Sequence, residues 1–144
     1  MNAQEMWNLY STQENIAADY EAWAFGDDAD KLAQLTLDGT KSATASAYPL
    51  YELEDEELPK AGEYSVILDS QDNAVCVIKT IKVYVAPFDE VSERHAYKEG
   101  EGDRSLAYWR KVHEEFFQSE LKEAGLVFDE KMDVVCEEFI RVYP

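Results

Sequence analysis

One short segment, from Gly39 to Ser46, concentrates side chains that could do chemistry. It places Lys41, Thr44 and other hydroxyl side chains in a backbone made otherwise of glycine and alanine. A threonine hydroxyl can attack an acyl carbonyl when a base takes its proton, and a neutral lysine amine can be that base. Lys41 and Thr44 are close enough in sequence to reach one small ligand. The segment also fits a helix C-cap that leads into an edge strand with a solvated lysine, and spacing alone favours this second interpretation.

Helices should precede this segment. A pattern starting near Asp28, with leucines at helical spacing, predicts a helix that Gly39 ends in a left-handed cap. Further upstream, Ser11 and Glu14 have the spacing of a capping box, which predicts a helix from about Thr12 to Phe25. A short helix around Met6, Trp7 and Tyr10 should come before it.

Strands should follow it. The segment 63–69 alternates like a strand, 70–73 has turn residues, and 74–85 is a long β-branched run. These features predict an antiparallel hairpin whose long strand carries a bulge and is ended by Pro87. Residues 132–143 should pair back as the final strand.

The connections differ in character. Residues 47–62 are acidic and contain two prolines, so we expect an irregular loop. Residues 89–94 should form a helical turn, and 95–103 a charged loop. A helix capped by Asp103 or Ser105 should then run to Gly125. His113 lies on the apolar stripe of that helix, where a core or rim histidine is the expected role.

Charge limits the classes of partner. A chain of 144 residues is about one domain, and its net charge of −18 opposes tight, non-specific binding of nucleic acid. Basic residues gather in one region, because seven of the 13 lie between positions 79 and 111. We therefore expect no double-stranded DNA partner, while a nucleoside or a short single strand could enter one cleft.

Other features exclude further classes. Cys76 and Cys136 lack a CxxC spacing, which indicates buried free thiols rather than a zinc site. The apolar runs are far too short for a membrane span, and the first residues lack the pattern of a signal peptide. We expect a cytoplasmic protein with no membrane partner, no cofactor and no bound metal.

Several blocks of sequence, in their order and spacing, resemble the ASCH domain family. They are Gly39-Thr40-Lys41-Ser42-Ala43-Thr44, Cys76–Thr80, Pro87–Val91, Glu99–Asp103 and Tyr108-Trp109-Arg110. The resemblance implies an α+β fold: a small PUA-like mixed β-barrel of about five or six strands with flanking helices. It places the ASCH domain at residues 25–144, with residues 1–24 as an N-terminal helical extension packed on the barrel of a single compact domain. The exposed strand edges of such a barrel permit a homodimer.

In the amidohydrolase branch of that family, the resemblance assigns the catalytic set to Lys41, Thr44 and Glu99. For Lys41 to act as a base, its pKa would have to fall from about 10.4 to roughly 7 or 8. A nearby Glu99 opposes this fall because it stabilises the ammonium. Either Glu99 shares a proton with Lys41 as an acid/base shuttle, or Lys41 stays charged and anchors a phosphate or an oxyanion.

The chain departs from the amidohydrolase pattern at one position, because Ser46 stands where those relatives carry an arginine. Arg94 or Arg104 would then have to replace that arginine from elsewhere. Tyr48 or Trp109 could stack on a base. The expected substrate-binding residues are Ser42, Ser46, Tyr48, Arg94, Arg104, Trp109 and Arg110.

Three functions remain open from the sequence. The first is a small-molecule amidohydrolase that acts on an acylated pyrimidine nucleoside. The second is a non-catalytic module that binds single-stranded RNA or a nucleotide in the same cleft. The third is a metal-dependent ribonuclease, which would need carboxylates such as Glu99, Glu101 and Asp103 to cluster in space.

Overall fold

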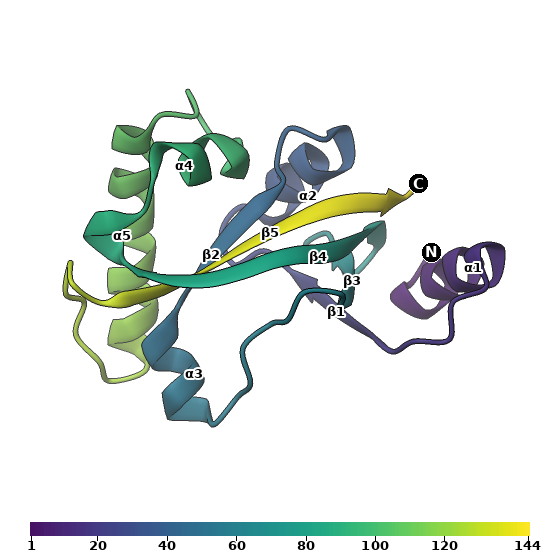
Figure 1. The fold of residues 1–144 in the computed structure, drawn as a ribbon, viewed down its shortest axis with the longest axis horizontal. Helices are drawn as coiled ribbons and strands as arrows, with labels where there is room; N and C mark the ends of the chain where they lie inside the picture. Colours follow the sequence, from purple (N-terminus) through teal and green to yellow (C-terminus); the bar gives the residue numbers. More distant parts are fainter.

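One curled sheet of five strands organises the chain, and a computed structural model describes all of residues 1–144 (Figure 1). The strand order is β1-β3-β4-β5-β2; β1 and β3 are parallel and every other pair is antiparallel. The strands are β1 (Tyr20–Ala24), β2 (Ala43–Ala47), β3 (Tyr64–Leu68), β4 (Ala74–Pro87) and β5 (Asp133–Tyr143). The helices are α1 (Ala3–Glu14), α2 (Ala29–Asp38), α3 (Tyr48–Glu54), α4 (Glu93–Glu99), α5 (Leu106–Glu123) and the 3-10 turn η1 (Phe88–Glu90).

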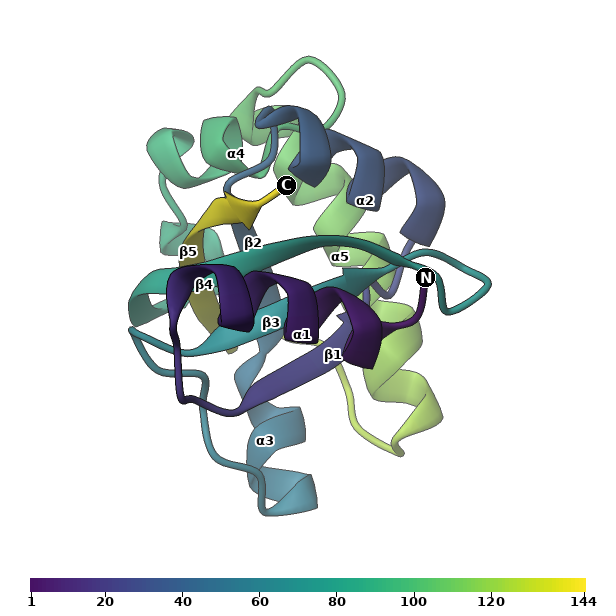
Figure 2. The ribbon, with the colours of Figure 1, turned by 90° about the vertical axis from the view of Figure 1, so that its right-hand side faces the viewer.

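The sheet is covered on both faces because its strands alternate buried side chains. Val66 and Val77 pack against the aromatic residues of α1, while Ile67 and Ile78 pack against Leu32 of α2. Figure 2 shows α1 in front of β3 and β4, with α2 and α5 behind the sheet. A third apolar cluster joins α5 to β5 and to η1, and these packed layers hold the connections that carry the site.

Several expectations from the sequence are confirmed. The helix ending at Gly39, the strand after it, the hairpin of β3 and β4 and the final strand are all present. The register of β4 shifts in two places against β5, as the predicted bulge required, and the strand curls into a half-barrel. Ser105 caps α5 by accepting a hydrogen bond from the backbone N–H of Tyr108. The cysteines are free and buried.

The predicted helix from Thr12 to Phe25 is wrong. The capping box that starts a helix here is formed by Asn2 and Glu5, and α1 ends at Asn15 in the left-handed conformation. The residues that follow form β1, which pairs in parallel with β3. Tyr20 of β1 stacks on Trp7 of α1, so tertiary pairing overrides the helical spacing of this segment.

Two smaller expectations also need correction. The acidic segment 47–62 is not irregular throughout, because α3 occupies its first half with Pro49 in its first turn, where proline is tolerated. The expected charged loop at 95–103 is helical up to Glu99, because Ser92 caps α4 and Gly100 ends it. None of the helices is long and apolar enough to cross a membrane.

Candidate functional site

Lys41 lies in the short connection between α2 and β2, and its side chain is buried with 2% exposure. Its Nζ donates hydrogen bonds to Glu99 Oε1 at 3.1 Å and to Glu101 Oε2 at 3.0 Å. Glu99 ends α4 and is 1% exposed, while Glu101 lies just beyond it. Two carboxylates therefore offset the charge of a lysine that has left water.

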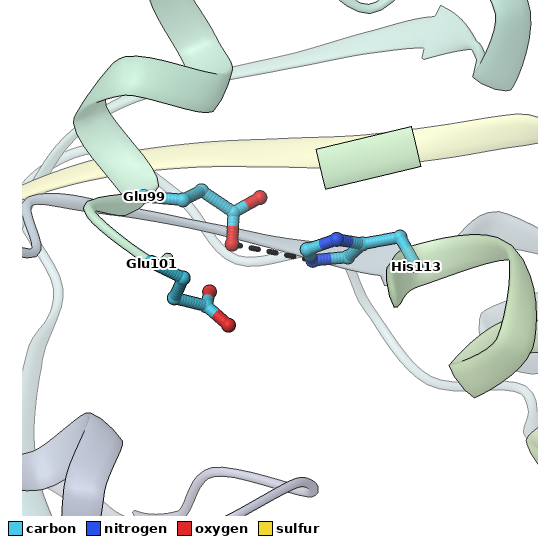
Figure 3. Close-up of side chains that lie close together, drawn as sticks. All are labelled: Glu99, Glu101 and His113. Atoms are coloured by element: carbon cyan, nitrogen blue, oxygen red, sulfur yellow. Dashed lines mark ion pairs between the residues drawn. The ribbon is translucent and has the colours of Figure 1, made fainter. Parts of the chain in front are cut away.

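A ring of donors holds Glu99. His95, one helical turn earlier, lies with Nε2 2.8 Å from Glu99 Oε2, and the indole N–H of Trp109 donates to the same oxygen at 2.5 Å. His113 Nε2 lies 3.4 Å from Glu99 Oε1, and Figure 3 shows this ion pair with Glu101 beside it. Trp109 and His113 come from the same face of α5 because they are four residues apart.

These contacts set the charges of the cluster. Burial alone would raise the pKa of Glu99, but Lys41, His113 and the hydrogen bond from His95 hold it well below its usual range. Burial opposes the charged form of His113, yet the Glu99 carboxylate raises the pKa of His113 above its usual value. The ground state is therefore an ionised Glu99 surrounded by cationic and neutral donors.

His113 is a site residue that sequence reasoning interpreted as core or rim. Its Nδ1 lies 2.9 Å from the carbonyl oxygen of Trp109, so this nitrogen carries a hydrogen and Nε2 faces Glu99. Its ring stacks on the Trp109 ring with centroids 4.3 Å apart. The sequence feature that could have identified His113 is its four-residue spacing from Trp109, which places both rings on the same face of α5.

Backbone contacts fix Lys41 against α4. Gly100 has a positive φ, and a Cβ there would lie 2.4 Å from the carbonyl oxygen of Thr40. The Ser42 N–H donates to the carbonyl of Lys98 at 2.7 Å, and Arg104 Nη2 donates to the Thr40 carbonyl at 3.3 Å. The two connections therefore approach so closely that only glycine fits at position 100.

The charged cluster faces a small recess of about 50 Å³, whose lining includes Lys41, Thr44, Glu99, Glu101 and His113. This recess adjoins a cleft of about 700 Å³. Residues shared by the two linings are Phe25, Gly26, Thr44, Ala45 and Phe116. The cleft has the size of a small-ligand site, and the recess brings the charged cluster to its end.

Two of the expected substrate-binding residues lie near these cavities. Ser46 lines the cleft and forms a hydrogen bond with the Tyr51 hydroxyl at 2.9 Å. Trp109 lies beneath the recess, 2% exposed, with its indole N–H on Glu99. Its ring is therefore covered by neighbours, and its visible role is to position Glu99.

The other expected substrate-binding residues lie outside the linings of the cleft and the recess. Ser42 forms a backbone hydrogen bond to Lys98 of α4. The aromatic ring of α3 that lines the cleft belongs to Tyr51 and not to Tyr48. Arg94 pairs with Glu138, and Arg110 donates to the carbonyl of Asp89. Arg104 stacks on the Tyr97 ring at 3.7 Å while bonding to backbone carbonyls.

The arrangement of acids bears on metal binding. Glu99, Glu101 and His113 bring three ligand atoms within 4.8 Å of one another. Asp103, the third carboxylate considered from the sequence, instead accepts a hydrogen bond from the Ser105 N–H. The Lys41 ammonium contacts both carboxylates of the trio, so it supplies the positive charge that a divalent cation would bring.

Comparisons with known proteins agree with this fold. A family model described as the ASCH domain matches residues 21–143. A crystal structure of an ASCH domain from Lactobacillus crispatus JV V101 is 32% identical, with a TM-score of 0.88, over 97% of this chain and 96% of that one. Protein EF3133 from Enterococcus faecalis V583 is 36% identical, with a TM-score of 0.92, over 99% of this chain and 88% of that one. The comparison with curated proteins found no match.

Proposed function

The chain belongs to the ASCH domain family, and from this premise we propose that it is a small-molecule amidohydrolase that removes an acyl group from a modified pyrimidine nucleoside. One observation carries the proposal. Lys41 lies in the connection before β2, Thr44 in β2 and Glu99 at the end of α4, and all three line the same recess at the end of a cleft of ligand size. The resemblance of the sequence to the amidohydrolase branch names the same three residues.

Thr44 is the nucleophile in this proposal. It is half-buried on the edge strand β2 and lines both the recess and the cleft, where a carbonyl carbon can meet its hydroxyl. The Thr44 side chain lines the recess and forms no hydrogen bond within the protein, so none has to be broken before attack. Its neighbours Ala43 and Ala45 leave the strand free of bulky groups there.

The proton follows a short route. One proton passes from Lys41 Nζ to Glu99 Oε1 across 3.1 Å, which leaves a neutral lysine and a protonated glutamate. Because the surrounding donors favour the ionised Glu99, this neutral pair is a minor state. Lys41 then takes the Thr44 proton as the hydroxyl adds to the acyl carbonyl, and it gives the proton to the leaving amine as the C–N bond breaks. Water hydrolyses the resulting ester of Thr44 and releases a carboxylic acid.

The cleft is less suited to a phosphate-bearing strand. Its lining contains no lysine, arginine or histidine, and Arg104 and Arg110 of the basic 79–111 region lie outside it. Binding of RNA needs cationic contacts to the backbone. A nucleoside without phosphate avoids this conflict, which is why the hydrolase is favoured over the RNA-binding module.

The experiment is incubation of the purified protein with acylated and unmodified pyrimidine nucleosides, followed by mass spectrometry. Thr44→Val removes the hydroxyl with little change of shape, and Lys41→Met removes the amine. We expect deacylated product from the wild type and none from either variant. Equal product from wild type and Thr44→Val would exclude the mechanism. No product, together with binding of single-stranded RNA that weakens with salt, would identify a binding module instead.

A further inference from the structure

The large cleft is acidic. Six glutamates line it, and no lysine, arginine or histidine joins them. They come from β1, the segment after α3, the residue before β3, α5 and β5. These are Glu21, Glu56, Glu57, Glu63, Glu120 and Glu137. Among them only Glu57 has a cationic partner, the exposed Lys60 at 3.5 Å. Charges of one sign gathered around a concave surface create a strong local potential for ions of the opposite sign.

Glu137 distinguishes this cleft from an ordinary solvated acidic surface. It is 9% exposed and lies in the middle of β5, where it lines the cleft. Thr80 donates a hydrogen bond of 2.7 Å to Oε2, while Oε1 accepts none from the protein. No cationic group lies within 4 Å of the carboxylate. A buried carboxylate without a counter-ion is costly unless a ligand supplies one.

The neighbours of Glu137 increase that cost. Burial raises the pKa of Glu137, the hydrogen bond from Thr80 lowers it, and the charges of Glu63 and Glu21 raise it further. The same acids therefore repel one another across the cleft. A cation bound between them would relieve the repulsion.

The rest of the lining fits an organic cation better than a metal ion. Ser65, 5% exposed, lines the cleft beside Thr80 and offers a hydroxyl. Trp23, Tyr51 and Phe116 add aromatic surface to the same cavity. Aromatic faces attract ammonium groups and also cover the hydrocarbon that carries them.

Position links this cleft to the recess. Glu137 of β5 is the direct antiparallel partner of Thr44 of β2, so their side chains stand on the same face of the sheet. An acyl group at Thr44 would therefore lie close to the Glu137 carboxylate. One ligand can contact both residues.

We propose that the cleft binds a protonated amine, and that the acylated substrate carries this positive charge on the part held by Glu137, Glu21 and Glu63. The claim that the charged compound is an acylated substrate rests on the proposed function. The claim that the cleft binds a protonated amine does not. The substrate class is thereby narrowed to acylated pyrimidine nucleosides that also carry a charged amine.

The test compares two probes of the same length by calorimetry at low salt. N-acetylputrescine ends in an ammonium, and N-pentylacetamide has a methyl group in its place. We expect the cationic probe to bind the wild type at least ten times more tightly, and its affinity to fall as salt is added. Equal affinities for the two probes, or no binding of the cationic probe, would overturn the proposal.

Matched variants locate the charge. Glu137→Gln should remove most of the preference for the cationic probe, while Glu114→Gln, an equal change of charge on the exposed face of α5, should preserve it. Glu63→Gln, at the exposed rim, should weaken binding of the cationic probe less than Glu137→Gln does. If Glu137→Gln unfolds at a lower temperature than the wild type, Glu63→Gln serves as the second variant. Equal losses of this preference in Glu137→Gln and Glu114→Gln would mean that only the overall negative charge of the protein attracts the probe, and would contradict a specific site.

Thr44→Val separates the two proposals. It should keep the wild-type preference for N-acetylputrescine over N-pentylacetamide, because the two probes share the acyl group and differ only in the charge that Glu137 contacts. If the cation binds but the wild type releases no product from any acylated compound, the hydrolase fails and the amine site stands. If product forms from neutral substrates as readily as from cationic ones, the hydrolase stands and the claim that its substrate carries the positive charge fails.

Discussion

The Lys41 ammonium lies 3.1 Å from the Glu99 carboxylate, although the two residues are 58 positions apart in the chain. Both side chains are buried, so neither charge can be left to water if its partner is removed. Breaking such a pair costs more than the pair itself contributes. The Lys41–Glu99 pair therefore contributes to the stability of the fold as well as to the candidate site.

The first prediction concerns this pair. Lys41→Met should lower the free energy of unfolding by about 3–5 kcal/mol at neutral pH, because it removes the lysine partner of a buried carboxylate. Adding Glu99→Gln to Lys41→Met should recover a large part of that loss, since the second change removes the buried charge that has lost its lysine. Urea denaturation of the two variants and the wild type measures both effects. Additive losses in the double variant would contradict the pairing.

The second prediction concerns pH. The pKa of His113 is raised in the folded protein above its ordinary value of 6.5, so protonation of His113 stabilises the fold. This contribution is complete below pH 6.5 and is lost as the pH rises through the raised, folded pKa. Comparing wild type with His113→Phe in urea from pH 5.5 to pH 9 should give a stability difference that is largest at the acid end and shrinks with rising pH. A difference that stays constant would show that His113 acts by packing alone.

The third prediction concerns Trp109. Trp109→Phe keeps an aromatic ring in the core but removes the N–H that donates to Glu99 Oε2. Loss of a hydrogen bond to a charged group should cost about 1.5–3 kcal/mol of stability. The acid limb of any pH–activity profile should also move to higher pH, because a donor to the ionised Glu99 is gone. An unchanged profile would restrict Trp109 to a packing role.

The fourth prediction concerns metal ions. Because Lys41 contacts both carboxylates of the Glu99–Glu101–His113 trio, Mn²⁺ should not raise the unfolding temperature of the wild type. Lys41→Ala removes the ammonium and should convert the trio into a cation site whose unfolding temperature rises with added Mn²⁺. Turnover by the wild type should also be insensitive to EDTA. Stabilisation of the wild type by Mn²⁺ would favour the metal-dependent ribonuclease.

The fifth prediction concerns the backbone at Gly100. Gly100→Ala should be destabilising by about 2 kcal/mol or more, because a positive φ and a clash with the Thr40 carbonyl act together. Gly125→Ala is the matched control, since Gly125 also has a positive φ but open space around it. The difference between the two variants in thermal unfolding measures the close approach of α4 to the Lys41 segment. Equal losses would mean that this approach is adjustable.

Hydrophobic periodicity and the residues that mark helix ends predicted much of the fold from the sequence. Gly39 and Ser105 marked helix boundaries, and the β-branched run of β4 indicated a long bulged strand, because these signals depend on residues close in the chain. The strand β1 was not predicted by this reasoning. Its helical spacing was outweighed by pairing with β3, a partner about forty residues away that no local pattern reveals.

The site divides in the same way. Lys41 and Thr44 stood out by composition, the resemblance added Glu99, and Glu101 was considered only as a carboxylate of a metal site. Sequence did not reveal that His113 and Glu101 join Lys41 and Glu99 in one charged cluster, or that Glu137 faces the cleft. A helical or strand pattern shows which side of an element is buried. It does not show which buried sides meet. Only the packing of α4, α5, β2 and β5 against one another decided that Glu99 and Glu101 contact a lysine while Glu137 has no cationic partner.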